Sequence, residues 1–229
     1  MTQPDYDLVI LGGGLGGGLL ARQMRLTRPE LRVLCLERAS DTAYKVGEAT
    51  VEMFSNYLVR KLGLTTYLYE NHLPKNGLRF FFDNEQKNAP IEKMSEIGSY
   101  GLPFHPSFQL DRSKLERELR DGSAKLGADI LEGCKVQDVE FGDPHHKVTF
   151  QEHNTSRSVT TKWVVDATGR SSLLAKKLDL RVPETQHRCL GSWARLGNVV
   201  DLDGHDIDPA WRARTRHTSR RLSTVHFMH

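Results

Sequence analysis

The chain contains little cysteine. Three cysteines occur among 229 residues, Cys35, Cys134 and Cys189, and they lie far apart in the sequence. This spacing excludes a disulfide-rich fold and provides none of the paired cysteines that bind zinc. Cys35 falls within an apolar run and is predicted to serve packing. Few, scattered thiols are typical of a reducing compartment, so we expect a cytoplasmic protein.

Long apolar runs and an excess of one charge are also missing. No segment approaches the roughly 20 apolar residues that cross a bilayer. The first apolar run resembles a buried strand rather than the core of a signal peptide. The 32 basic and 29 acidic residues leave a net charge of only +3. The sequence therefore predicts neither a membrane nor a nucleic-acid partner, and the basic stretch Trp211–Arg221 is interpreted as a solvated face.

Metal-ligand and nucleophile patterns are absent from the sequence as well. There are 10 histidines, but the adjacent pair His145 and His146 lies in a predicted turn, GDPHHK. Neighbouring side chains of an extended segment point to opposite faces, so this pair is not a metal site. No G-x-S-x-G sequence is present. We expect no bound metal and no serine nucleophile.

Glycine, in contrast, is concentrated at one place. Seven consecutive positions from Gly12 hold six glycines and one leucine, between the apolar run Tyr6–Leu11 and the amphipathic run Leu19–Leu26. Strand, glycine turn and helix open a βαβ unit of the kind that binds a dinucleotide. Gly12 is expected to allow the tight turn, Gly14 to admit a pyrophosphate, and Gly17 to let the helix lie close to the strand.

A second apolar run with a terminal acid supports this interpretation. The segment Leu31–Glu37 reads as the next strand, and Glu37 lies 20 residues after Gly17. A carboxylate at this position is expected to accept hydrogen bonds from a ribose. The alternative is a glycine-rich turn with a solvent-facing Glu37. Because FAD and NAD share an ADP half, the pattern alone allows either cofactor.

The remaining elements follow from periodicity and turn signals. Between residues 51 and 107, these patterns predict a helix over 51–64, a strand over 78–83 and a polar loop over 84–107. A helix over 108–128 follows, with Asp111 as its N-cap and Leu115, Leu119 and Leu126 inward. Strands are predicted over 128–133, 134–141, 146–153 and 157–169, then a helix over 172–180 and strands over 188–200 and 220–228.

The order of these elements favours FAD over NAD. The run WVVDATG ends in Asp166 and Gly169. An acid and a glycine at the carboxyl end of a core parallel strand mark a ligand-facing position. NAD dehydrogenases usually continue with more βα units, whereas in this chain a β-meander is predicted before the last parallel strand. We expect an α/β fold, a Rossmann-like FAD/NAD(P)-binding domain of the GR2 type with an inserted β-rich segment.

Four segments match a family pattern in order and in spacing. YKVGEAT ends at Thr50, and LPKNGLRFFF places Lys75 25 residues after Thr50 and five before Phe80. The helix and strand over 108–139 and the segment WVVDATGRSSLLAKKL complete the set. Together they resemble flavin-dependent halogenases of the tryptophan-halogenase type and related group-A flavin monooxygenases.

The resemblance implies FAD as the cofactor and Lys75 as the catalytic residue. An ammonium group there would hold or activate a hypohalous acid, and the alternative is a surface lysine at the start of a strand. The resemblance and the glycine pattern together give these cofactor-binding residues: Gly12, Gly14, Gly17, Glu37, Arg38, Gly47, Glu48, Ala49, Thr50, Arg112, Val136, Asp166 and Gly169.

Several of these residues have implied roles with an alternative beside them. The segment Gly47–Thr50 is implied to face the flavin ring, and Thr50 is also a candidate helix N-cap. Arg112 pairs either with a phosphate of FAD or with Glu116 one helical turn later.

Three further residues are implied to lie along the cofactor. Val136 would contact adenine through its backbone. Asp166 and Gly169 would lie near the phosphates or the ribityl chain, with Asp166 as an acid of the turn as the alternative.

The chain departs from the halogenase pattern in two places. None of Trp163, Trp193 and Trp211 forms the W-x-W-x-I-P box of halogenases, and the later Gly-Asp segment is missing. By this resemblance, residues 1–229 are a truncated FAD-binding domain. Its expected parts are a βαβ unit and flavin loop over 1–50, an inserted substrate-side segment over 73–110, a return to the FAD domain over 111–180, and an incomplete substrate-domain sheet over 187–229.

The function implied is that of a halogenase-like, FAD-dependent monooxygenase. Its substrate would be an aromatic or carrier-bound small molecule. Since no second nucleotide motif is visible, a separate flavin reductase is favoured as the electron donor. Two alternatives remain open, a flavin hydroxylase or geranylgeranyl-reductase-like enzyme, and an inactive fold that binds a nucleotide or a partner protein.

Overall fold

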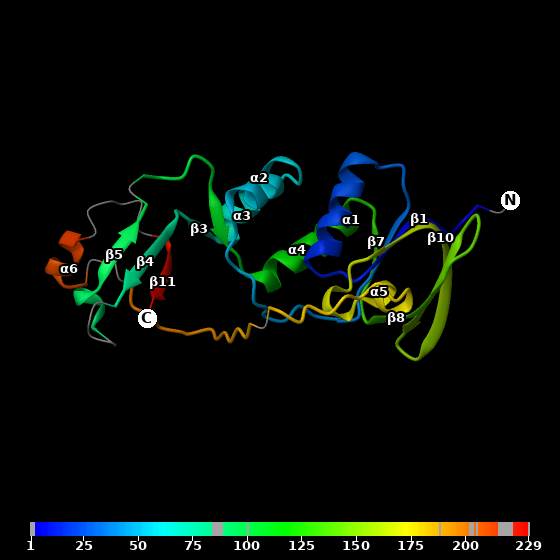
Figure 1. Ribbon diagram of the computed structural model, residues 1–229. Helices are drawn as coiled ribbons and strands as arrows, with labels where there is room; N and C mark the ends of the chain where they lie inside the picture. The colour runs from blue at the N-terminus through cyan, green and yellow to red at the C-terminus, as the bar shows by residue number, and fades with distance from the viewer. Residues whose placement is uncertain are drawn as a thin grey trace. The chain divides into compact units, whose positions relative to one another are not determined.

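A computed structural model describes residues 3–83, 89–99, 101–187, 189–201, 204, 206–214 and 222–228 (Figure 1). Contacts divide the chain into two compact units. The first consists of Met1–Lys45 and Asp111–Leu190, and the second of Val46–Leu110 and Gly191–His229. Each unit is described by itself below.

The first unit is built on a six-stranded sheet. The strand order is β7-β2-β1-β10-β9-β8. The bounds are β1 Tyr6–Leu11, β2 Val33–Leu36, β7 Asp129–Leu131, β8 Cys134–Glu140, β9 His146–Glu152 and β10 Thr155–Asp166. Strands β7, β2, β1 and the second half of β10 run parallel, while β10, β9 and β8 form an antiparallel meander. Asp166 therefore ends a parallel strand beside β1, as predicted.

Strand β1 is apolar on both faces because both are covered. Leu8 and Ile10 pack toward helix α1 (Leu15–Thr27), in a cluster that includes Ala21. Val9 and Leu11 pack toward apolar residues of β8 and β9. A strand buried on both sides reads as a continuous apolar run, which is how the sequence shows it.

Helix α4 (Arg112–Lys125) lies beside α1 in the first unit, as Figure 1 shows. It begins as predicted, because the Asp111 carboxylate accepts hydrogen bonds from the N–H groups of Ser113 and Lys114. Leu115 and Leu119 are fully buried, and Leu126 is half-buried. A 3-10 turn (Gly169–Ser171) and the short helix α5 (Leu173–Lys177) follow β10.

Among its described residues, the second unit contains two small sheets and three helices. One sheet has the order β11-β4-β5 and the other pairs β3 with β6. The bounds are α2 Glu52–Arg60, α3 Thr65–Asn71, β3 Leu73–Lys75, β4 Leu78–Phe82, a 3-10 turn Ile91–Lys93, β5 Ser95–Gly98, β6 Ser107–Gln109, α6 Pro209–Arg214 and β11 Thr224–Met228. Figure 1 shows β4 between β5 and β11.

Three expectations for the second unit are wrong. The loop expected over 84–107 contains β5 and a 3-10 turn, although residues 84–88 and 100 lie outside the described residues. No strand occurs over the described part of 188–200, which is residues 189–200. The start of the helix expected over 108–128 is wrong, because residues 107–109 form β6 and the helix begins at Arg112. Helices α3 and α6 and strand β3 were not predicted. Trp211 is buried and stacks on Phe81 with ring centroids 5.8 Å apart, while the basic side chains of the stretch Trp211–Arg221, expected to be solvated, lie outside the described residues.

Among the described residues, no helix combines the length and the apolar character that a membrane crossing requires.

Asp7 joins three strands of the first unit. Its carboxylate accepts a hydrogen bond from the Arg32 N–H at 2.9 Å and lies 2.8 Å from the Lys162 ammonium. The Lys162 ammonium, followed by the Arg32 N–H, lowers the pKa of Asp7 from 3.8 to about 2. A carboxyl group whose pKa is lowered by folding stabilises the fold above its unfolded pKa and loses that effect as the pH falls through its folded pKa.

We therefore expect Asp7→Asn to lower the free energy of unfolding at neutral pH by about 1–2 kcal/mol. The variant should also lose the part of the wild-type stability decline that falls between about pH 4 and pH 2. Denaturant unfolding at several pH values measures both effects, with Asp143→Asn in the exposed turn before β9 as the control. An Asp7→Asn variant as stable as the wild type at pH 7 would contradict this account.

Candidate functional site

The turn between β1 and α1 is shaped by two glycines. Gly12 has φ +100°, and a Cβ atom there would lie 2.6 Å from the carbonyl oxygen of Ala167. A Cβ atom on Gly17 would lie 1.8 Å from the carbonyl oxygen of Gly12. Both distances are far shorter than any van der Waals contact. The turn, the segment after β10 and the first turn of α1 therefore meet backbone to backbone.

Gly14 is the N-cap of α1 and leaves open space beside it. Its backbone is extended, it makes no side-chain capping bond, and the first turn of α1 carries no acidic residue. A Cβ atom on Gly14 would meet only one atom within 4 Å, Oε2 of Glu116 at 4.0 Å. The N–H groups at a helix start without a side-chain cap favour an anion. This is the position at which a pyrophosphate was expected.

Glu37 lies against the glycine turn at the end of β2. Its Oε2 accepts a hydrogen bond from the Gly13 N–H at 2.7 Å, and its Oε1 accepts one from the Ala39 N–H at 2.8 Å. Glu37 is half-buried, and both of its carboxylate oxygens accept hydrogen bonds from the backbone. Arg38, the next residue, is exposed. The carboxylate is held where β1 and β2 end side by side.

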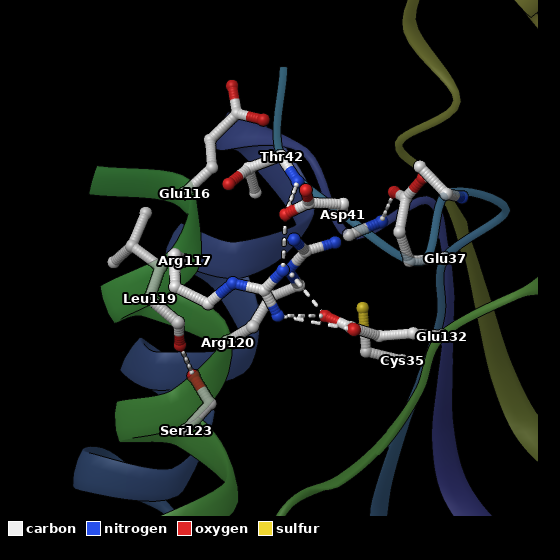
Figure 2. Close-up of polar contacts among 12 residues, drawn as sticks. Cys35, Glu37, Asp41, Thr42, Glu116, Arg117, Leu119, Arg120, Ser123 and Glu132 are labelled. Carbon is white, nitrogen blue, oxygen red and sulfur yellow. Dashed lines mark hydrogen bonds and ion pairs between the residues drawn. The ribbon is translucent and has the colours of Figure 1, made fainter. Parts of the chain in front are cut away.

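Charged side chains that the sequence did not single out support the loop after β2. Figure 2 shows Arg117 of α4 between Asp41 at 3.0 Å and Glu132 at 2.9 Å. The guanidinium Nε of Arg120, one of the most buried charged groups, lies 3.1 Å from Glu132. These pairs connect the loop after β2, the helix α4 and the segment after β7. The partners of these pairs lie 12 to 76 positions apart in the sequence, which explains why no local pattern indicated them.

Cys35 lies in β2, two residues before Glu37, and has a structural role. It is fully buried in β2. Burial, with the charge of Glu37 adding to it, raises the pKa of the Cys35 thiol to about 12. The thiol therefore stays protonated and unreactive at physiological pH, which agrees with the packing role that the sequence predicted.

Arg112 is paired within the helix. Its guanidinium donates to Oε1 of Glu116 from Nε at 3.1 Å and from Nη2 at 2.5 Å. Glu116 also forms an ion pair with Lys45 through Oε2. Of the two partners that the sequence left open for Arg112, the structure contains the Glu116 pair.

Asp166 forms the turn after β10. It accepts hydrogen bonds from the hydroxyl group of Thr168 at 2.6 Å, the Thr168 N–H at 3.0 Å and the Leu174 N–H at 2.7 Å. Burial opposes ionisation, but these hydrogen bonds outweigh it and lower the pKa of Asp166. Asp166 is thus an acid of the turn, and it holds the segment whose Ala167 carbonyl faces Gly12.

The other two residues named along the cofactor lie in different surroundings. Gly169 has φ +61° and open space around it. Val136 is half-buried in β8 opposite Phe150, directly before a register shift. Their contact with a cofactor stays a prediction, as does every binding role assigned above.

In the second unit, the segment Gly47–Thr50 lies along β6. The Leu110 N–H donates to the Glu48 carbonyl oxygen at 2.7 Å, and Ala49 forms an isolated antiparallel bridge with Gln109. The Thr50 hydroxyl group donates to the Phe108 carbonyl oxygen at 2.7 Å and accepts from the Phe108 N–H at 2.8 Å. Thr50 is therefore not a helix N-cap. Val51 has that position and makes no side-chain capping bond.

Gly47 has φ +94° and begins this segment, where an L side chain would be strained.

Lys75 is buried beside this segment. Only 8% of its surface is exposed, so the alternative of a surface lysine is wrong. Its ammonium group donates to the Thr50 carbonyl oxygen at 2.5 Å. Its backbone pairs with Ser107 in β6, whose hydroxyl group donates to the Lys75 carbonyl oxygen at 2.9 Å. The structure therefore joins Lys75 to Thr50, two residues 25 positions apart.

Comparison with known proteins supports the same interpretation. Residues 5–219 match the model of the FAD binding domain family. The flavin-dependent halogenase chlA of Dictyostelium discoideum is 29% identical over 93% of this chain and 40% of its own length. The chlorinase of a 1H-pyrrole-2-carbonyl peptidyl-carrier protein from Pseudomonas fluorescens is 28% identical over 79% of this chain and 43% of its own length. The chain thus spans about 40% of the length of these relatives.

Solved structures share the fold. A variant of the halogenase PltM in complex with FAD superposes with a TM-score of 0.71, at 21% identity, over 97% of this chain and 46% of its own. A flavoprotein/dehydrogenase from Cytophaga hutchinsonii gives a TM-score of 0.66 at 18% identity, over 80% of this chain and 44% of its own. The predicted α/β, FAD-binding Rossmann-like fold is confirmed.

The residues of the first unit fit the ADP half of such a cofactor. Gly14 leaves a cradle that a side chain would fill, the helix start lacks a side-chain cap, and a carboxylate ends β2. Each of these features suits one part of an adenine dinucleotide, the pyrophosphate for the first two and the ribose for the third.

The close approach of Gly17 to Gly12 predicts opposite effects for two neighbouring glycines. Gly17→Ala should lower the free energy of unfolding by more than about 2 kcal/mol, because the new methyl group requires the helix to move away from the strand. Gly16→Ala, in the same helix with nothing within 4 Å of its Cβ position, should raise it by up to about 1 kcal/mol. Denaturant unfolding of both variants tests the pair. Equal effects would show that α1 does not depend on this contact.

Proposed function

Because the chain belongs to the FAD binding domain family, we propose that it is the cofactor-binding part of a halogenase-like, FAD-dependent monooxygenase. FAD as the cofactor and the resemblance to flavin-dependent halogenases, both expected from the sequence, are confirmed by the family match and the halogenase relatives. The observation that carries the proposal for this chain is the buried lysine of the second unit, held by the carbonyl oxygen of Thr50.

The first unit is proposed to bind the ADP half of FAD. Gly12, Gly14 and Gly17 would form the turn that receives the pyrophosphate, and Glu37 would accept hydrogen bonds from the ribose. The remaining proposed contacts in this unit are Arg38, Arg112, Val136, Asp166 and Gly169. Asp166 would act by fixing the backbone after β10, since its carboxylate is engaged within the turn.

The second unit is proposed to be the substrate side, with Gly47, Glu48, Ala49 and Thr50 as flavin contacts. When bound, reduced FAD would activate O₂ so that a halide is oxidised to a hypohalous acid. Lys75 would bind the hypohalous acid that results. An ammonium group carries three donors, and one of them is directed to Thr50. The others can hydrogen-bond the oxygen of a hypohalous acid and hold it away from water.

The substrate class is proposed from the relatives, and the partner and the location from the sequence. One relative acts on a pyrrole-carbonyl group bound to a carrier protein, and a PltM structure contains phloroglucinol. An aromatic or carrier-bound small molecule is therefore the proposed substrate. A separate flavin reductase is proposed as the electron donor, because the sequence shows only one nucleotide motif. The sparse cysteines favour a cytoplasmic location.

Substitution of Gly14 tests the nucleotide site. Gly14→Val should fold, since an extended N-cap with open space tolerates a side chain, but its side chain would occupy the pyrophosphate position. We expect FAD binding to weaken by at least about tenfold, which is about 1.4 kcal/mol. Quenching of flavin fluorescence measures the affinity, with Gly101→Val, also in open space, as the control. Unchanged FAD affinity in Gly14→Val would refute the proposed site.

Substitution of Lys75 tests whether the protein is a halogenase rather than a flavin hydroxylase or a reductase. In a full-length protein that contains this chain, Lys75→Met should abolish halogenation and leave FAD affinity within about twofold, because it removes a donor but not a nucleotide contact. The exposed Lys61 provides the control Lys61→Met. Undiminished halogenation in Lys75→Met would exclude the proposed role. Oxygenation or reduction of a substrate by the wild type without halogenation would favour a hydroxylase or a reductase.

A further inference from the structure

A buried carboxylate lies close to the open space beside Gly14, where the pyrophosphate is proposed to bind. Glu116 of α4 has 1% of its side chain exposed. Its Oε2 is the one atom within 4 Å of the position of a Cβ on Gly14. In Figure 2 the Glu116 side chain points away from the Arg117–Glu132 pair. The anion that faces the start of α1 in this structure therefore comes from the protein itself.

Two cations are bound to this carboxylate. Oε1 accepts two hydrogen bonds from Arg112, at 3.1 and 2.5 Å, and Oε2 pairs with Lys45. The three side chains differ in exposure, 1% for Glu116, 16% for Arg112 and 45% for Lys45. Lys45 and Arg112 thus reach the surface, while the anion that pairs with them is buried.

We propose that Glu116 is a resident anion of the nucleotide site, whose carboxylate holds Lys45 and Arg112 beside the glycine turn and competes with the pyrophosphate of FAD for these two cations. The proposal rests on the proposed nucleotide site. The glycine turn, the helix start and the two cations all favour an anion at one place. Glu116 supplies it when no nucleotide is present, and it repels the phosphates when they arrive.

The arrangement explains why a carboxylate is buried at a site that is otherwise suited to phosphate. Without an anion, Arg112 and Lys45 would face each other and the positive end of α1, which is unfavourable. With Glu116 the group is satisfied and keeps a charge of +1, so it still attracts a pyrophosphate. The cations are ordered before the nucleotide binds, at the cost of one repulsive contact.

Neutralising Glu116 is therefore expected to tighten binding. Removal of a unit negative charge near the phosphates should strengthen ADP and FAD binding by at least about threefold, even with the dielectric screening of water. Adenosine, which has no phosphate, should bind Glu116→Gln and the wild type equally. Glu118→Gln in the same helix is the matched control, because Glu118 is directed toward Arg22 and Gly122.

The experiment compares titrations of ADP, FAD and adenosine into the wild type, Glu116→Gln and Glu118→Gln by calorimetry. Tighter ADP and FAD binding by Glu116→Gln alone, with adenosine unchanged, is the expected result. Weaker or equal ADP binding would overturn the proposal and make Glu116 a supporting residue of the site. An equal gain for adenosine would overturn it as well, because the effect would not involve the phosphates.

If Glu116→Gln does not fold, the same comparison can be made in a protein that already carries Lys45→Met. In Glu116→Gln, Lys45 and Arg112 both lose the carboxylate with which they pair. Lys45→Met removes one of these two unpaired cations, so the double variant Lys45→Met/Glu116→Gln should fold. It should bind ADP more tightly than the single variant Lys45→Met. Weaker or equal binding by the double variant would overturn the proposal. Failure of the wild type to bind ADP or FAD is a separate result, which would refute the nucleotide site itself.

Discussion

The structure of the first unit depends on the close approach of three backbone segments, at Gly12, Gly17 and Ala167. A Cβ atom on Gly17 would lie 1.8 Å from the carbonyl oxygen of Gly12. A Cβ atom on Gly12 would lie 2.6 Å from the carbonyl oxygen of Ala167. Because neither residue has a side chain, α1 can begin directly at the end of β1, beside the segment that follows β10. The helix start is thereby brought to the carboxyl ends of three neighbouring strands, which is where open α/β sheets bind their ligands.

Charge is organised around this point. Glu37 ends β2 and accepts a hydrogen bond from the turn itself, Asp166 ends β10 and holds the backbone behind it, and Glu116 faces the helix start from α4. Arg112 and Lys45 keep the last of these in place. The proposed nucleotide site therefore combines two cations that a pyrophosphate would use with an internal anion that pairs with them. Its affinity depends on the balance between them.

The sequence predicted the parts of this site that are local. The order of β1, the glycines, α1, β2 and Glu37 follows a fixed spacing, and Asp111 shows its N-cap role within three residues. Elements that depend on distant partners were not predictable in this way. Strand β3 is three residues long and exists through its pairing with β6. The apolar positions over 189–200 resemble a strand but have no pairing partner among the described residues. Helical periodicity indicates the Arg112–Glu116 pair, but it does not reveal that Lys45, 71 positions earlier, also pairs with Glu116.

The most direct measurement is a crystal structure of the chain with FAD bound. The account predicts a pyrophosphate oxygen within hydrogen-bonding distance of the N–H groups at the start of α1, and a ribose hydroxyl group on the carboxylate of Glu37. It also predicts that Lys45 or Arg112 contacts a phosphate and that Glu116 has lost at least one of its two cations. Adenine and phosphates bound elsewhere, with the Gly14 cradle empty, would contradict the account.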